Sequence, residues 1–359
     1  MYKGIEGLRA WLAWTVVLSH MATVIVPVSM LPMFGVAAEA AVKVFIIISG
    51  FVITHLILGK KERFRLYISR RFLRIYPAYL VALLFSILIA NLSYRAILEF
   101  PGMPASMVQQ SIVEQQQFNE NFATHLWAHL SLFHGALPNS VLPQSEYMFL
   151  GPAWSLSLEW QFYFLAPIWI WALRRFPLLT VGSCLLAAVS YKLFLSGAFF
   201  NPSFLPGSCL LFLLGMSTRF WLPSAPRLKE YPFAAVLGFF GVSIIDRQLI
   251  IIPIWIAIVA YLMQDGKWGA LDGPAARAAG MRSYAVYIIH EPILFIALFV
   301  TSNQLHLSGP MFVISFVAAS IIGTLVLSEA IHRWIEMPAI DYAKTLGRPS
   351  LAGQMRPIE

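Results

Sequence analysis

The chain has 359 residues, of which 59% are hydrophobic and only 12% are charged, and its mean hydropathy is +0.72. Soluble domains carry about 25% charged residues, so this composition excludes an ordinary soluble protein. A membrane-crossing helix takes about 20 apolar residues, and about ten of them would leave no room for a second folded domain. The net charge of +8 would suggest a nucleic-acid partner in a soluble protein, so its distribution along the chain matters.

Uninterrupted apolar windows predict an all-α integral membrane protein, a bundle of about ten transmembrane helices. The predicted helices cover residues 7–27, 38–58, 75–92, 150–173, 178–198, 204–222, 232–246, 249–264, 284–302 and 310–331. Only Asp246, Arg247 and Gln248 separate the seventh from the eighth, so the pair reads as a tight hairpin or as one broken span. Residues 93–149 are predicted to form one long extracytoplasmic loop, and loops of such length are more often functional than incidental.

The basic residues fall almost entirely on one side of this predicted bundle. With the N-terminus in the cytoplasm, 21 of the 25 Lys and Arg residues lie on the cytoplasmic side. The exceptions are Arg95 and Arg247 in outside loops and Lys43 and Lys192 within spans. The positive-inside rule therefore predicts that both termini are cytoplasmic. It also accounts for the basic composition, so we expect the lipid bilayer and no nucleic acid as a partner.

Residues 1–345 are expected to form a single transmembrane domain, followed by a short cytoplasmic tail over residues 346–359. Cys184 and Cys209 lie in apolar runs, which is typical of core thiols and not of a disulfide framework or a metal site. We expect no bound metal and no permanently bound cofactor. The spans do not pair by length or by Gly and Pro position, which argues against an inverted-repeat transporter.

Three ionisable residues at membrane depth are the first functional candidates, because such groups are costly there. Arg9 and His20 are eleven positions apart in the first predicted helix, hence on one face and about 16 Å apart along its axis. Glu159 lies at a similar depth in the fourth helix. The match predicts a His20–Glu159 pair for proton transfer, in which the carboxylate orients the imidazole. A structural ion pair between the helices is the alternative.

A cluster of arginines precedes the third predicted helix. Arg71 and Arg74 are one helical turn apart and follow directly on Arg70. Guanidinium groups at that spacing grip phosphate, so the phosphates of a nucleotide or of CoA are candidate ligands. Anionic lipid headgroups would satisfy the same residues.

The ninth predicted helix carries a histidine next to a proline, His290, with Tyr284 and Tyr287 near its face. If the helix starts at residue 284, His290 lies about 9 Å from the inner membrane surface. Its role there could be functional or purely structural. Lys43 and Glu336 are weaker candidates, with structural alternatives: Lys43 could snorkel outward, and Glu336-x-Pro338 could simply end the last helix.

Six motifs occur in one order across nearly the whole chain, and together they resemble the membrane-bound acyltransferase family 3, which contains bacterial O-antigen and exopolysaccharide O-acetylases. They are Gly7-Leu8-Arg9 with His20, Phe45 to Phe51 containing Ser49-Gly50-Phe51, Arg70-Arg71-x-x-Arg74-Ile75-x-Pro77, Trp154-Ser155-Leu156-x-x-Glu159-x-x-Phe162-Tyr163, Ser283-Tyr284-x-x-Tyr287-x-x-His290-x-Pro292, and Glu336-x-Pro338. One position departs from the family: Lys43 stands where an acid is common.

The resemblance implies an enzyme of the bacterial inner membrane that moves an acyl group, usually acetyl from acetyl-CoA, onto a hydroxyl of a cell-surface or exported glycan. It implies catalytic roles for Arg9 and His20, to which the depth argument adds Glu159, and acyl-CoA binding by Arg71 and Arg74, to which we add Arg70. The further pocket candidates are Ser49, Trp154, Ser155, Tyr163, Tyr284, Tyr287, His290, Lys43 and Glu336.

One function from another class competes with this interpretation. A proton-coupled transporter or flippase of a lipid-linked sugar would use His20, Glu159 and Lys43 as a proton relay. Acetyl-CoA binding distinguishes the two. The sequence specifies neither the acceptor glycan nor the oligomeric state.

Overall fold

The computed structural model describes residues 4–60, 62–221, 251, 255 and 269–347, and within them the chain is helical without strands. The predicted spans 232–246 and 249–264 lie outside the described residues, apart from Ile251 and Trp255. The α-helices, in chain order, are α1 (Gly4–Ile25), α2 (Leu31–Gly59), α3 (Phe64–Leu88), α4 (Ala90–Glu99), α5 (Ala105–Leu130), α6 (Trp154–Arg175), α7 (Pro177–Ser190), α8 (Leu205–Trp221), α11 (Gly269–Asp272), α12 (Pro274–Leu298), α13 (Gly309–Ile331) and α14 (Met337–Thr345).

Short helical turns join or extend several of these helices. The 3-10 turns are η1 (Val28–Met30), η2 (His134–Ala136), η3 (Gly151–Ala153) and η5 (Ser196–Ala198), and the π-helical turns are η4 (Tyr191–Leu195), η7 (Phe299–Gln304) and η8 (His332–Glu336).

Six helical stretches of the described chain are long and apolar enough to cross a membrane, which indicates a multi-pass membrane protein. They are Gly4–Ile25, Val28–Gly59, Phe64–Leu88, Pro177–Ala198, Pro274–Gln304 and Gly309–Thr345. Helix α6 coincides with a predicted span but is not among them, and its sequence includes Glu159, Arg174 and Arg175.

Two predicted spans begin about three turns too late. Helix α3 starts at Phe64 instead of residue 75, and α12 starts at Pro274 instead of residue 284. Charged residues lower the hydropathy of both missed segments, but they do not prevent a helix, because Arg is a good helix former. Helix α12 also begins with Pro in its first turn, followed by alanines, and both favour a helix start. A search for apolar windows therefore misses helical turns that leave the hydrocarbon.

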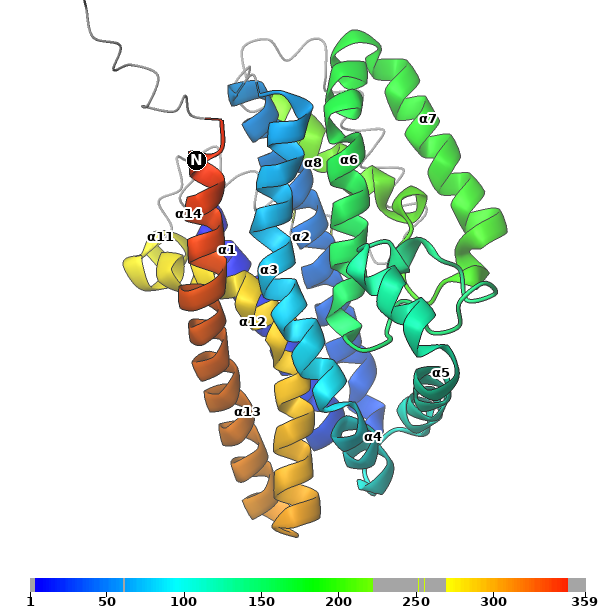
Figure 1. The fold of residues 1–359 in the computed structure, drawn as a ribbon, viewed down its shortest axis with the longest axis vertical. Helices are drawn as coiled ribbons and strands as arrows, with labels where there is room; N and C mark the ends of the chain where they lie inside the picture. The colour runs from blue at the N-terminus through cyan, green and yellow to red at the C-terminus, as the bar shows by residue number, and fades with distance from the viewer. Residues whose placement is uncertain (1–3, 61, 222–250, 252–254, 256–268, 348–359) are drawn as a thin grey trace, which may run out of the picture.

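The predicted long loop, residues 93–149, contains most of α4 and all of α5, and neither helix is among the membrane-compatible stretches of the described chain. Helix α5 is rich in Gln, and pairs one turn apart support it: Gln110 donates to Glu114 at 2.8 Å and Gln116 to Glu120 at 3.0 Å. Its axis is kinked at Asn121, where φ is −127°. In Figure 1, α4 and α5 lie at the lower end of the molecule, away from the start of α3.

Small residues allow the central helices to approach closely, as is common inside membranes. A Cβ added at Gly280 of α12 would overlap the carbonyl oxygen of Glu6 in α1, and one at Gly7 would overlap that of Leu271. Gly50 of α2 lies equally close to the backbone of α8. Helices α1 and α12 run in the same direction, because His20 and His290 meet further along the same pair.

Candidate active site

A cavity of about 360 Å³ lies among α1, α2, α3, α6 and α12, within the size range of small-molecule sites. Nine of the residues predicted from the sequence line it: Arg9, Ser49, Arg71, Arg74, Ser155, Glu159, Tyr163, Tyr284 and Tyr287. These residues are scattered from position 9 to position 287 of the chain, so only the packing of the helices brings them together.

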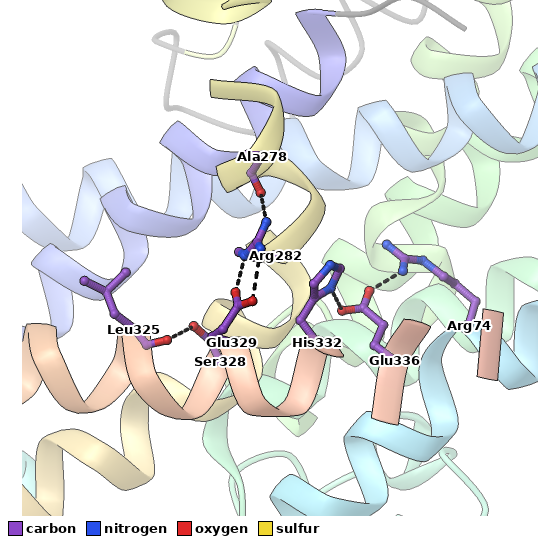
Figure 2. Close-up of polar contacts among 8 residues, drawn as sticks. All are labelled: Arg74, Ala278, Arg282, Leu325, Ser328, Glu329, His332 and Glu336. Carbon is purple, nitrogen blue, oxygen red and sulfur yellow. Dashed lines mark hydrogen bonds and ion pairs between the residues drawn. The ribbon is translucent and has the colours of Figure 1, made fainter. Parts of the chain in front are cut away.

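Three arginines line the cavity, and they differ in their partners. Arg74 forms an ion pair with the buried carboxylate of Glu336, which also accepts a hydrogen bond from His332 Nδ1 at 2.8 Å (Figure 2). Among the described residues, Arg9 and Arg71 have no hydrogen-bond or ion-pair partner, and Arg71 Nε is buried without one. The hydroxyl of Ser283, also in the cavity wall, is likewise buried without a partner. The cavity therefore holds two guanidinium groups free to bind an anion.

Glu336 does not end the last helix, which excludes the structural alternative, and it lies outside the cavity lining. The chain continues from α13 through the π-helical turn η8 into α14. Pro338 lies in the first turn of α14, where proline is tolerated because a backbone N–H at that position has no partner within the helix. The extra residue in a π-helical turn places Glu336 against α3, where it neutralises Arg74.

Arg70, predicted to bind acyl-CoA, does not line the cavity. Successive helical residues point about 100° apart, so the side chain next to Arg71 leaves this face. Arg70 instead pairs with Glu62 and donates to the carbonyl oxygens of Ala343 and Leu346, at 3.1 and 2.7 Å. Its contacts fasten the end of α14 to α3.

Glu159 is bonded to two hydroxyl groups in the cavity wall. Its Oε1 accepts from Ser49 at 2.7 Å and from Tyr163 at 2.6 Å. The predicted His20–Glu159 pair is not formed. Equal depth along two helices says nothing about which faces of the helices meet, and the face of α1 that carries His20 packs against α12.

His20 instead pairs with His290, whose Nε2 lies 3.0 Å from His20 Nδ1. His290 Nδ1 lies 2.7 Å from the carbonyl oxygen of Tyr287, which can only accept, so this ring nitrogen carries the proton. When both rings are neutral, His290 Nε2 is then an acceptor for the N–H on His20 Nδ1. His20 Nε2 is left with the lone pair and has no hydrogen-bond partner among the described residues.

His290 meets His20 because α12 begins ten residues earlier than predicted. His290 lies 16 residues after Pro274, or about 24 Å along the helix, and His20 lies 16 residues after Gly4. His290 therefore lies far from the start of its helix, while its depth below the inner membrane surface stays a prediction.

Tyr287 connects this histidine pair to the cavity. Its ring faces the cavity and its ring centroid is 6.1 Å from that of His290. Its hydroxyl group lies 2.8 Å from Ser155 Oγ and 3.2 Å from the carbonyl oxygen of Pro152. Tyr284, one turn earlier, donates to the carbonyl oxygen of Ile75 at 2.7 Å. The imidazoles thus lie one side chain beyond the cavity wall.

Two other predicted residues lie outside the cavity lining. Trp154 opens α6 and packs against the hydrophobic core. Lys43 does not snorkel outward; it is buried and forms an ion pair with Glu39 at 2.6 Å, one turn earlier on α2.

Two further polar residues of this region, Ser283 and Glu291, are not among the candidates predicted from the sequence. Ser283 stands in one of the quoted motifs, and Glu291 is an ionisable residue inside a predicted span, so the rule applied to Glu159 would have found it. Glu291 Oε2 accepts a hydrogen bond from the backbone N–H of Gly151 at 2.9 Å.

Comparison with known proteins bears directly on this arrangement. Residues 2–329 match the sequence profile of an acyltransferase domain, Acyl_transf_3. A stretch of 144 residues, 40% of this chain, is 30% identical to acyltransferase MdmB of Streptomyces mycarofaciens, and it covers only 31% of that protein. No solved structure matches the chain. Because the profile spans both the cavity and the histidine pair, the chain belongs to the acyltransferase 3 family of membrane acyltransferases.

Proposed function

We propose that this protein, in the bacterial inner membrane, transfers an acyl group, in the first instance acetyl, from acyl-CoA to a hydroxyl group of a cell-surface or exported glycan. One observation carries the proposal. A hydrogen-bonded histidine pair lies one side chain beyond a cavity that contains two arginines without an anionic partner among the described residues.

Arg9 and Arg71 are the groups that hold the donor. CoA carries phosphates, and guanidinium forks bind phosphate in a bidentate geometry. Arg74 has its charge balanced by Glu336, so it orders the wall of the cavity and contributes less net attraction for an anion. The apolar lining from α2, including Phe45 and Ile48, suits the pantetheine arm and the acyl chain.

His20 acts as the general base. Its Nε2 takes the proton of the acceptor hydroxyl while that oxygen attacks the thioester carbonyl carbon. The C–S bond then breaks, and the departing CoA thiolate takes the proton back from the imidazolium. The products are the ester and free CoA. Glu159 in this mechanism positions the Ser49 and Tyr163 hydroxyls beside the donor and does not orient His20.

The transporter alternative finds no support in these contacts. A proton relay would need His20, Glu159 and Lys43 to lie within reach of one another. In the described residues His20 bonds to His290, Glu159 to Ser49 and Tyr163, and Lys43 to Glu39.

Acetyl-CoA binding and hydrolysis by the purified protein in detergent test the proposal. Arg71→Ala removes a phosphate contact and is expected to weaken acetyl-CoA binding about tenfold or more, because hydrogen bonds to charged groups contribute about 1.5–3 kcal/mol. Arg65→Ala is the matched control, since Arg65 is exposed on the same helix. His20→Ala should bind acetyl-CoA normally and lose turnover. A wild-type protein that binds no acyl-CoA would exclude the proposal.

A further inference from the structure

A second pocket, of about 120 Å³, lies among α4, α5, the segment before α6 and the second half of α12. Its polar lining residues include Tyr94, Gln110, Glu114, Gln115, Tyr147 and Glu291. The pocket belongs to the end of the molecule where α4 and α5 lie in Figure 1, whereas Arg71 and Arg74 lie in the first half of α3.

One helical turn of α12 separates this pocket from the donor cavity. Tyr287 lines the cavity and Glu291, four residues and about 6 Å further along, lines the second pocket. Two hydrogen bonds hold the segment from Gly151 to Ser155 against α12. Gly151 bonds to Glu291 beside the second pocket, and Ser155 bonds to Tyr287 beside the donor cavity. The two spaces therefore share a thin wall, and His290 stands in that turn of α12.

The C-terminal half of α1 shares a hydrophobic cluster with residues that line the second pocket. Ile97 and Met107, which line the pocket, pack in one hydrophobic cluster with Val17 and Met21 of α1. Val17 and Met21 lie one turn before His20 and directly after it. The base of the proposed reaction bonds to His290, which lies on α12 between Tyr287 of the donor cavity and Glu291 of this pocket.

The chemistry of the two linings is different. The donor cavity contains Arg9, Arg71 and Arg74, whereas no Lys, Arg or His lines the described second pocket. Its polar groups are amides, hydroxyls and two carboxyl groups, set among the rings of Tyr94, Phe118, Tyr147 and Phe149. The pocket offers no positive charge to an anion. It does offer hydrogen-bond partners to hydroxyl groups and aromatic surface to the apolar face of a sugar ring.

Glu114 adds a feature that suits hydroxyl groups. Burial raises its pKa to about 8, against the opposing effect of the Gln110 amide and with a contribution from the nearby Glu291 carboxyl. At neutral pH it is therefore mostly protonated, and it both donates and accepts hydrogen bonds.

We propose that the second pocket binds the acceptor, an uncharged polyhydroxylated molecule of the sugar class, and holds one of its hydroxyl groups toward His20. The assignment of the bound molecule as acceptor rests on the proposed acyl transfer. The existence of the sugar site does not depend on it.

Binding of methyl glycosides tests the site without any donor. The probes are the methyl glycosides of glucose, galactose, mannose and N-acetylglucosamine, detected on the purified protein in nanodiscs by saturation-transfer NMR. Wild type is expected to bind at least one of them. Gln115→Ala and Glu114→Leu each remove hydrogen-bonding groups from the pocket and are expected to weaken that binding about tenfold, which corresponds to about 1.4 kcal/mol.

Matched variants separate a loss of the site from a loss of the fold. Gln116 is the neighbour of Gln115 but is exposed and bonded to Glu120, so Gln116→Ala should bind glycosides as wild type does. Glu114→Gln keeps a neutral hydrogen-bonding group and should also retain binding. Arg71→Ala should weaken acetyl-CoA binding and leave glycoside binding unchanged.

Two results would overturn the proposal: wild type binds none of the glycosides, or both Gln115→Ala and Glu114→Leu bind them as wild type does. Failure of acyl transfer gives a different result. In that case acetyl-CoA does not bind to wild type, while the glycosides still bind and Gln115→Ala still weakens their binding.

Discussion

At the scale of single residues, the centre of the site is two imidazoles in contact and not an imidazole beside a carboxylate. A neutral His290 fixes the tautomer of His20 without adding a buried negative charge, because its own Nδ1 proton is committed to the Tyr287 carbonyl oxygen. Partners of this kind, which orient a reactive group through its second ring nitrogen, typically contribute one to two orders of magnitude in activity or affinity. In the proposed mechanism His290 is thus a positioning residue.

Replacing His290 tests this role. His290→Ala is expected to lower kcat about 10- to 100-fold with the KM for acetyl-CoA unchanged, because His20 then loses its preferred tautomer and orientation. His290→Gln restores an acceptor for His20 Nδ1–H and should recover part of the loss. The measurement is acetyl transfer to the glycoside acceptor as a function of pH, and the alanine variant should also shift the pH at which kcat falls on acidification. Equal kcat and equal pH profiles in wild type and His290→Ala would contradict the role.

Glu114 makes stability depend on pH. Its pKa rises from 4.5 to about 8 in the folded protein because it is buried. Between these values the folded state binds a proton that the unfolded state has released, so this group's contribution to stability is complete below about pH 4.5 and declines as the pH rises toward 8. Glu114→Gln, which is always neutral, should remove this decline.

The check on Glu114 is the melting temperature in detergent, followed from pH 5 to pH 8.5. The difference in melting temperature, Glu114→Gln minus wild type, should grow more positive with pH. A difference that does not change across the range would show that the Glu114 carboxyl titrates normally.

At the scale of elements, the contact between α1 and α12 determines whether the two histidines meet. Their backbones approach at Gly280, where any side chain would overlap the carbonyl oxygen of Glu6 in α1, and Gly7 of α1 lies equally close to Leu271 in α11, the helix that precedes α12. The π-helical turn η8 has a comparable effect on α14, since it turns Glu336 toward Arg74 and leaves Arg70 to bond the end of that helix. Helix packing therefore decides which arginine stays available to a ligand.

Gly280→Ala tests the close approach of α1 and α12. The added methyl group forces the helices apart, and overpacking of this kind costs about 1–3 kcal/mol, so both the melting temperature and acetyl transfer should fall. Gly182→Ala on α7 is the matched control, because nothing lies within 4 Å of the added Cβ. That control should be neutral or slightly stabilising, since Ala is about 0.5–1 kcal/mol better than Gly within a helix. Equal melting temperatures for the two variants would argue against the packing role of Gly280.

At the scale of the whole molecule, two spaces of different charge lie along α12, one on each side of the histidine pair. The cationic cavity lies among the first halves of α1, α3 and α12, and the pocket without basic residues is lined by α4 and α5. A cytoplasmic donor and an acceptor outside the cytoplasm would approach from opposite ends of such an arrangement. The orientation follows from the positive-inside rule, which predicts that the start of α3 faces the cytoplasm.

Cysteine labelling tests this orientation. Arg65 at the start of α3 and Gln116 on α5 are both exposed, and the native Cys184 and Cys209 are buried, so single substitutions report cleanly. A membrane-impermeant maleimide should label Gln116→Cys in intact spheroplasts. It should label Arg65→Cys only after the membrane is permeabilised. The reverse pattern would invert the predicted topology.

The sequence alone determined the helical membrane character, because apolar runs of sufficient length have few other stable forms in a bilayer. Its motifs also selected nine of the residues that line the cavity, including Arg9, Arg71 and Ser49, and pointed to the family. It did not reveal α4 and α5, whose polar residues fold as helices outside any apolar window, or the early start of α12.

Only the tertiary structure decided which of the selected residues meet. Spacing along a helix fixes a residue's depth, but the crossing of helices fixes its partner, and for this reason His20 contacts His290 while Glu159 contacts Ser49 and Tyr163. Neutralisation of Arg74 by Glu336, 262 residues away in the chain, follows from the same cause. Contacts between distant segments depend on the packing of the whole bundle, and local sequence patterns do not encode that packing.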